Sequence, residues 1–150
     1  MSQPLSRLQA GTAAVAAKRA AGTTWPDIAA ALGRSPVWSA SAVLGQQRLD
    51  QAQAVVLGEL LRLPAEVVTA LQLPPDRTAA AVDLTDPLVY RLTEMVQVYG
   101  SALRELVGEQ FGDGIISAID FEVDIERVAD PKGDRVVLTL NGKFLPYRVW

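Results

Sequence analysis

Arg91, Glu94 and Ser117 are the residues whose types and spacing are best suited to chemistry in this sequence. The chain contains no histidine and no cysteine, so it lacks the usual general base near neutral pH, the commonest transition-metal ligand and any thiolate. Any chemistry must therefore rely on carboxylates, arginine, lysine, tyrosine, hydroxyls and backbone dipoles. The sequence brings one guanidinium, one carboxylate and one hydroxyl close to the same buried surface.

A capped amphipathic helix is expected to position Arg91 and Glu94. Asp86 suits the N-cap, because its carboxylate can accept from the free N–H groups of the first turn, and Pro87 loses no hydrogen bond at the first helical position. At about 100° per residue, the arginine and the glutamate lie about 60° apart beside an apolar stripe. The members of this stripe, expected to be buried, recur at spacings of three and four: Leu88, Leu92, Met95, Tyr99, Leu103 and Leu106.

A glycine-rich turn and an apolar strand are expected to position Ser117. Gly112 and Gly114 can take positive φ, and Asp113 suits a turn, so F-G-D-G ends the helix. Residues 115–119 then read as a strand that enters the interior. The serine is a polar group in this apolar run, and a buried hydroxyl needs a hydrogen-bonding partner.

Each of these residues also has an ordinary structural interpretation. Arg91 and Glu94 at i, i+3 match a surface ion pair, worth only about 0.2–0.5 kcal/mol. Ser117 matches a buried hydroxyl that caps the end of a strand by hydrogen bonding. If only these three residues are considered, the structural interpretation is better than the catalytic one.

The surrounding motif changes this balance. Y-R-L-T-E-M-V-Q-V-Y-G followed by F-G-D-G-I-I-S-A-I-D-F resembles the signature of the cyanase family, also called cyanate hydratase or cyanate lyase. The family's fixed arginine, glutamate and serine fall on Arg91, Glu94 and Ser117, with the residues between them also matching. The stretch Asn141–Pro146 resembles the family's C-terminal N/D-G-K-F/Y-L-P. The resemblance covers essentially the whole chain.

The resemblance implies a lyase that decomposes cyanate to ammonia and carbon dioxide through carbamate, with bicarbonate as co-substrate and without metal or organic cofactor. Two anions at about 4 Å repel by about 4 kcal/mol at an effective dielectric of 20, and Arg91 is the cation expected to offset this. Ser117, with the backbone N–H groups of residues 112–116, is expected to donate where charge develops. Glu94 is expected to orient the arginine or to relay a proton.

The C-terminal part of the chain is thin for an independent core. Residues 119–126 alternate apolar and acidic side chains as a strand does, and residues 130–133 suit a turn. Asn141-Gly142 is the strongest short hairpin signal and predicts a second hairpin there. One long helix and about three short strands need partner chains. The residues predict an obligate oligomer, and the resemblance implies a homodecamer, a pentamer of dimers, with intertwined strands and shared active sites.

The N-terminal part predicts helices and a rival function. Helices are expected over residues 4–21, 24–32, from 36 to about 44, over about 50–61, and briefly after Pro64. The second and third have the layout of a helix-turn-helix, so a DNA-binding regulator is the alternative. A recognition helix needs arginine, lysine, asparagine or glutamine at its start, whereas this one presents Pro36, Val37 and Trp38.

The sequence thus predicts an α+β fold with two domains. Residues 1–76 form an all-helical, repressor-like domain, and residues 77–150 form a catalytic and oligomerisation domain of one long helix and a short β-sheet that intertwines with a partner subunit. The linker is expected over residues 73–85, where two prolines precede an alanine run.

Composition limits the other possibilities. With 150 residues and 49% hydrophobic content, the chain can form one compact unit or two small ones. A net charge of −3 argues against nucleic acid as a main partner. No apolar run has the length of a membrane span and no leader pattern is visible, so no membrane association and a cytoplasmic location are expected.

Overall fold

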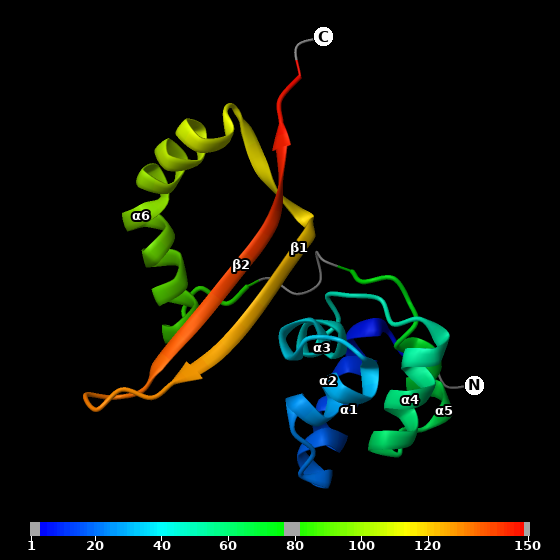
Figure 1. Ribbon diagram of the computed structural model, residues 1–150. Helices are drawn as coiled ribbons and strands as arrows, with labels where there is room; N and C mark the ends of the chain where they lie inside the picture. Colours follow the sequence, from blue (N-terminus) through cyan, green and yellow to red (C-terminus); the bar gives the residue numbers. More distant parts are fainter. Residues whose placement is uncertain (1–3, 77–81, 149–150) are drawn as a thin grey trace. The chain divides into compact units, whose positions relative to one another are not determined.

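The computed structural model describes residues 4–76 and 82–148 and confirms the α+β class (Figure 1). Its contacts divide the chain into two units, one of Met1–Ala80 with Val123–Thr139 and one of Ala81–Glu122 with Leu140–Trp150. The predicted domain boundary between residues 76 and 77 adjoins residues 77–81, which lie outside the described residues, so the boundary stays a prediction. No helix of the described segments is long and apolar enough to cross a membrane.

The N-terminal helices form where predicted, but the first begins at Arg7, three residues after its predicted start at residue 4. Ser6, Thr24 and Asp50 are N-caps whose side chains accept from the backbone of the first turn in capping boxes. Gly22 and Gly33 end two helices in the left-handed conformation. The helices are α1 (Arg7–Ala21), α2 (Trp25–Leu32), α3 (Pro36–Val43), α4 (Gln51–Leu61) and α5 (Ala65–Ala70).

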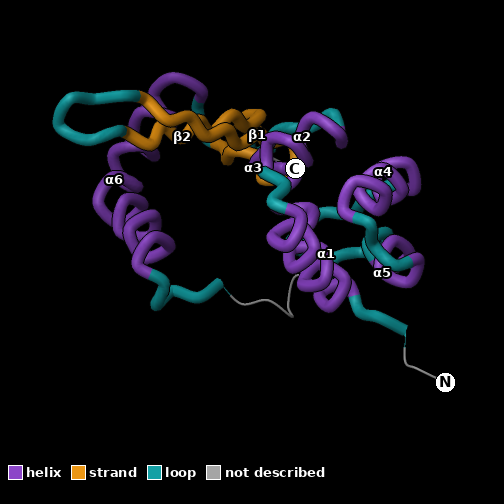
Figure 2. The backbone as a smooth tube through the Cα atoms, turned by 90° about the horizontal axis from the view of Figure 1, so that it is seen from below, coloured by secondary structure: helices purple, strands orange, loops and turns teal. Residues whose placement is uncertain are grey.

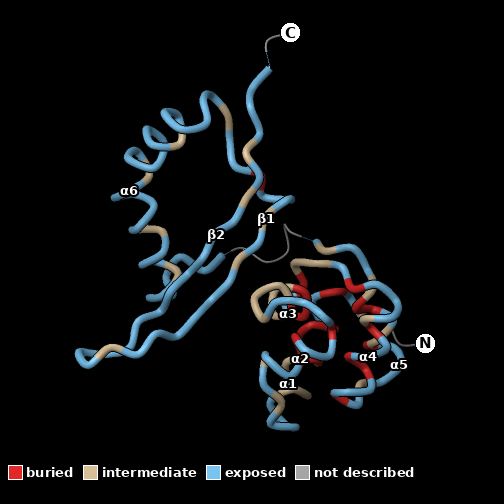
Figure 3. Tube along the Cα trace, in the orientation of Figure 1, coloured by how far each residue is buried: buried red, intermediate tan, exposed pale blue. Residues whose placement is uncertain are grey.

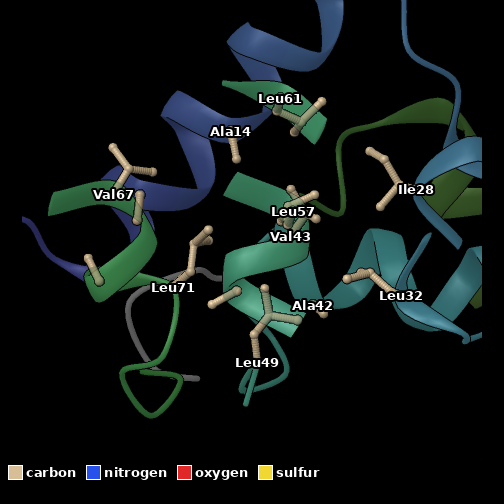
Figure 4. Close-up of a cluster of buried hydrophobic side chains, with 13 residues drawn as sticks. Ala14, Ile28, Leu32, Ala42, Val43, Leu49, Leu57, Leu61, Val67 and Leu71 are labelled. Carbon is tan, nitrogen blue, oxygen red and sulfur yellow. The ribbon is translucent and has the colours of Figure 1, made fainter. Parts of the chain in front are cut away.

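These five helices enclose the apolar core of their unit. The side chains point toward one another from all five helices and from the loop that contains Leu49 (Figure 4). Burying such side chains is the main favourable term for folding this unit. The largest fully buried apolar members are Ile28, Val43, Leu49, Leu57 and Leu71.

α1 packs closely against the end of α3 through a glycine and an arginine. A Cβ added to Gly11 would lie 2.6 Å from the carbonyl oxygen of Val43. The buried guanidinium of Arg7 donates to the carbonyl oxygens of Ala42 and Gln47, where a cation suits the C-terminal end of the helix. Burial lowers the pKa of Arg7 from its ordinary value.

Gly11→Ala is expected to lower the free energy of unfolding of the helical unit by about 1–3 kcal/mol, because the new methyl group meets backbone that cannot rotate away. Urea denaturation followed by circular dichroism measures this. Thr12→Ala, at the neighbouring exposed position of α1, is the control and should change stability by less than about 0.5 kcal/mol. Equal stability of Gly11→Ala and the wild type would contradict the close helix contact.

The hydroxyl of Ser39 is fully buried in α3, and within the described residues it has no hydrogen-bonding partner. An unpaired buried hydroxyl costs free energy, and alanine also has the higher helix propensity. Ser39→Ala is therefore expected to raise the free energy of unfolding by about 1 kcal/mol, measured by the same denaturation. A clear loss of stability would show that the hydroxyl is paired in solution.

α6 (Pro87–Phe111) has Asp86 as its N-cap, as predicted. The Asp86 carboxylate accepts from the N–H groups of Leu88 and Val89 at 2.9 and 3.0 Å. None of its residues is buried, and Figure 3 shows the helix exposed or half-buried along its whole length. The predicted apolar stripe exists, but the expectation of its burial is wrong for a single chain. The described chain alone supplies no surface that covers it.

The helix is followed by one two-stranded antiparallel sheet of β1 (Gly114–Val128) and β2 (Arg135–Pro146), which run side by side in Figures 1 and 2. The predicted turn at residues 130–133 closes this hairpin, with the Gly133 N–H donating to the Asp130 carbonyl at 2.9 Å. The Lys132 amide and the Arg135 guanidinium hold the pKa of the Asp130 carboxyl below its usual value.

The predicted hairpin at Asn141-Gly142 is wrong. Both residues lie inside β2, which is continuous, so the sheet has two long strands in place of about three short ones. A two-residue hairpin turn of this type needs positive φ, and Gly142 is not among the positive-φ residues of the described chain. Pairing with β1 outweighs the local turn preference.

Candidate functional site

The structure brings Arg91 and Glu94 together on one side of α6. Arg91 Nη1 donates to Glu94 Oε2 at 2.6 Å, and the Arg91 guanidinium lies 5.9 Å from the centre of the Tyr90 ring. The two side chains are 70% and 45% exposed within one chain. Such an exposed pair stabilises the helix little. The glutamate holds the guanidinium in place while leaving most of it accessible.

Ser117 lies on β1 and is 8% exposed. Its Oγ accepts from the backbone N–H groups of Ile119 at 3.1 Å and Asp120 at 2.9 Å. These two bonds supply the partner that a buried hydroxyl was predicted to need, and they occupy both acceptor positions of the oxygen. The hydroxyl hydrogen takes no part in them. Ser117 is therefore arranged to donate a hydrogen bond.

The glycine-rich turn joins α6 to β1 as predicted. Gly112 has φ +90°, which only glycine adopts readily, and its N–H donates to the Gly108 carbonyl at 3.0 Å. The Asp113 carbonyl accepts from the Tyr147 N–H at 3.1 Å, which fixes the turn to the end of β2. The turn therefore holds the start of β1, and with it the segment that carries Ser117.

An open hollow of about 710 Å³ lies beside this turn. Neither Arg91 nor Ser117 lines it. Arg104 does, and sequence reasoning did not single out this cation, since nothing in its spacing separates it from an ordinary exposed helix residue. The lining includes Gly100, Leu103, Arg104, Asp113, Ile115 and Ile116.

The three predicted site residues form two separate groups within one chain. Arg91 is paired with Glu94, whereas the hydrogen bonds of Ser117 Oγ are made to its own strand. Among the described residues no hydrogen bond or ion pair joins Ser117 to either of the other two. A site containing all three is therefore not assembled by contacts within one chain.

Comparisons with known proteins cover nearly the whole chain. The family described as "Cyanate hydratase, N-terminal" matches residues 7–75, and "Cyanate lyase C-terminal domain" matches residues 81–149. A cyanate hydratase of Thiobacillus denitrificans is 52% identical over 89% of this chain and 91% of its own length. A cyanate hydratase of Dechloromonas aromatica is 50% identical over 85% of this chain and 87% of its own length. The crystal structure of cyanase from T. urticae is similar with a TM-score of 0.83 and 36% identity, covering 91% of this chain and 96% of the other.

Proposed function

Because this chain belongs to the cyanate lyase family, we propose that it decomposes cyanate with bicarbonate as the second substrate, at sites that contain Arg91, Glu94 and Ser117. The chain is a cyanate hydratase, a lyase. The observation that carries the proposal is the match to both halves of the family together with the arginine, glutamate and serine at their motif positions. Bicarbonate, the residue roles and the assembly are the proposed parts.

The proposed reaction joins two anions and needs two protons. A bicarbonate oxygen attacks the cyanate carbon, and the carboxylated intermediate takes up a proton and loses CO2 to leave carbamate. Carbamate takes a second proton on nitrogen and breaks into ammonia and another CO2. The first step is the difficult one, because two like charges must come within bonding distance.

Arg91 is the group proposed to offset that repulsion. A guanidinium stays charged at any working pH and can hold two oxygens with parallel donors. Its ion pair with Glu94 supports this role, because the carboxylate engages one nitrogen at 2.6 Å and fixes the orientation of the remaining donors. Glu94 is also the nearest carboxylate to Arg91 that could pass a proton to the nitrogen that leaves as ammonia.

Ser117 is proposed to donate to an oxygen of the dianionic intermediate. The two N–H groups that bind its Oγ support donation and oppose nucleophilic attack, because they occupy the acceptor positions through which the oxygen would attack. A serine nucleophile would also need an adjacent base, and the chain has no histidine to supply one. Donors aimed at developing charge stabilise a transition state in this way.

The sites are proposed to form between subunits of a homodecamer. Leu88 and Tyr99 of α6 are 70% and 59% exposed, and Ile119 of β1 is 98% exposed. A long helix with no buried residue and a two-stranded sheet cannot form a stable core alone. Further copies of the chain would cover these surfaces and could bring Ser117 of one copy to Arg91 of another. The count of ten stays a prediction from the family resemblance, and a cytoplasmic location stays a prediction from the sequence.

The test is ammonia release from cyanate by purified protein, with and without added bicarbonate. We expect release that requires both substrates, in buffer freed of dissolved CO2 so that bicarbonate is under control. The same rate without bicarbonate would contradict its role as a reactant. No release under any condition would contradict the function.

Metal removal is expected to leave this activity unchanged. The chain has neither histidine nor cysteine, so the commonest transition-metal ligands are missing, and the proposed site relies on a guanidinium for positive charge. Dialysis against EDTA followed by the ammonia assay in metal-free buffer measures this. A loss of activity that zinc or another divalent cation restores would show that Arg91 is not the only cation involved.

The alternative, a DNA-binding regulator, is not favoured, because the relatives are cyanate hydratases over nearly their whole length. The structure gives a local reason as well. The guanidinium of Arg34, which precedes α3, lies 5.0 Å from the ring centre of Trp38 in α3. An arginine in this arrangement is engaged with an aromatic ring of the helix that follows it.

A further inference from the structure

β1 departs from a regular strand where Ser117 lies. Ile116 and Phe121 both lie against Gly142 of β2: their Cγ2 and Cδ2 atoms are close to the position that a Cβ of residue 142 would take. In a regular strand, residues five apart point to opposite faces and lie about 17 Å apart. Residues 117–120 must therefore leave the regular strand in an excursion. The greater length of β1, with 15 residues against 12 in β2, agrees with this.

The Ser117 hydroxyl closes the excursion. Its Oγ accepts from the N–H groups of Ile119 and Asp120, which bend the backbone back toward β2. The excursion turns Ser117 inward, at 8% exposed, and Ile119 outward, at 98% exposed. At its far end, Asp120 Oδ2 lies 4.0 Å from Nζ of Lys143, the residue after Gly142. The orientation of the Ser117 hydroxyl therefore depends on how closely residues 117–120 approach β2.

Glycine at position 142 is needed there for space. The φ of Gly142 is not positive, so its backbone conformation is open to other residues. A Cβ, however, would lie 2.6 Å from Phe121 Cδ2 and closer still to Ile116 Cγ2. Contacts this short do not occur between packed carbon atoms. A side chain at residue 142 would push apart the two ends of the excursion.

We propose that Gly142 is a positioning residue for the Ser117 hydroxyl: by leaving room for Ile116 and Phe121 over one position of β2, it allows the excursion of residues 117–120 to close. This inference rests on the proposed function of Ser117. It also accounts for Asn141-Gly142, a turn signal that the fold does not use as a turn. The absence of a side chain at Gly142 leaves space for Ile116 and Phe121 of β1.

Gly142→Ala tests the proposal through two readouts, turnover and hydrogen–deuterium exchange of the peptide that contains Ile119 and Asp120. We expect a folded assembly of wild-type mass in which this peptide exchanges about tenfold faster, as loss of hydrogen bonds of typical net strength predicts. We expect kcat to fall by about 100-fold with KM for cyanate changed less than about twofold, because a displaced donor mainly loses contact with the transition state.

Gly11→Ala is the control, since a Cβ at Gly11 would also collide, with the carbonyl oxygen of Val43 at 2.6 Å, but lies in the helical unit. It should lower stability without changing kcat or the exchange of this peptide. Unchanged exchange and kcat in a folded Gly142→Ala assembly would overturn the proposal. If Gly142→Ala does not assemble, Gly142→Ala combined with Ile116→Ala and Phe121→Ala removes both colliding side chains. Regained assembly with faster turnover than Ser117→Ala would support the proposal, and no recovery would overturn it.

The readouts also separate this inference from the proposed function. If Ser117→Ala keeps full turnover, the catalytic role of Ser117 fails, whereas faster exchange in Gly142→Ala would still show that Gly142 closes the excursion. If Ser117→Ala loses turnover and Gly142→Ala changes neither readout, the function stands and the role of Gly142 is excluded.

Discussion

Arg91→Ala is expected to lower kcat/KM for cyanate by about 1,000-fold. Without the guanidinium, the repulsion of about 4 kcal/mol between two approaching anions is no longer offset, and each 1.4 kcal/mol corresponds to about tenfold in rate. Steady-state ammonia release at varied cyanate and bicarbonate measures the effect. Both substrates should show it, because both anions are proposed to share the cation.

Arg91→Lys is the matched variant, since lysine keeps the charge and loses the paired donors. We expect it to recover part of the lost activity. Recovery to the wild-type rate would show that charge alone matters, and Arg91→Ala with wild-type kinetics would remove Arg91 from the site. Arg104→Ala distinguishes a local effect from a general loss of positive charge, because Arg104 is the other arginine of α6 and lines the hollow that Arg91 does not line. A fall of similar size in this variant would contradict the assignment to Arg91.

Ser117→Ala is expected to lower kcat by about 100- to 1,000-fold, the usual effect of losing one donor to developing negative charge. A second contribution comes from the backbone, because alanine cannot accept from the Ile119 and Asp120 N–H groups that close the excursion. The measurement is single-turnover ammonia release, which isolates the chemical step.

Ser117→Thr keeps the hydroxyl and should retain more activity than Ser117→Ala. Mass spectrometry of the wild type quenched during turnover should show no covalent adduct, because Ser117 is assigned as a donor. An adduct on Ser117 would replace the donor role with a nucleophilic one. Full turnover of Ser117→Ala would remove the residue from the mechanism.

Local signals predicted most of the fold. The cap at Asp86, the glycine stops after α1 and α2 and the turn at residues 130–133 were readable because each depends on residues adjacent in sequence. The Asn141-Gly142 hairpin was wrong because both residues lie inside β2, which pairs with β1, a strand that is distant in sequence. Local propensity does not report such pairing.

The residues assigned to the site stay a prediction, and their geometry could be predicted only in part. The spacing of Arg91 and Glu94 gave their ion pair, because the helical period fixes which side chains meet. The hydrogen bonds from the Ile119 and Asp120 N–H groups to Ser117 Oγ were not predictable, since they follow from an excursion of the backbone. The exposure of the α6 stripe was missed because helical periodicity shows which side chains share a face, and not whether a surface covers that face.

Arg91 and Ser117 are proposed to act in one site, although within one chain no hydrogen bond or ion pair among the described residues joins them. Mixing two inactive variants, Arg91→Ala and Ser117→Ala, under conditions that exchange subunits tests this directly. If the residues meet across a subunit boundary, mixed assemblies contain some sites with both residues intact, and ammonia release should reappear at a substantial fraction of the wild-type rate. Mixed assemblies as inactive as either parent, with subunit exchange verified by mass spectrometry, would contradict the account.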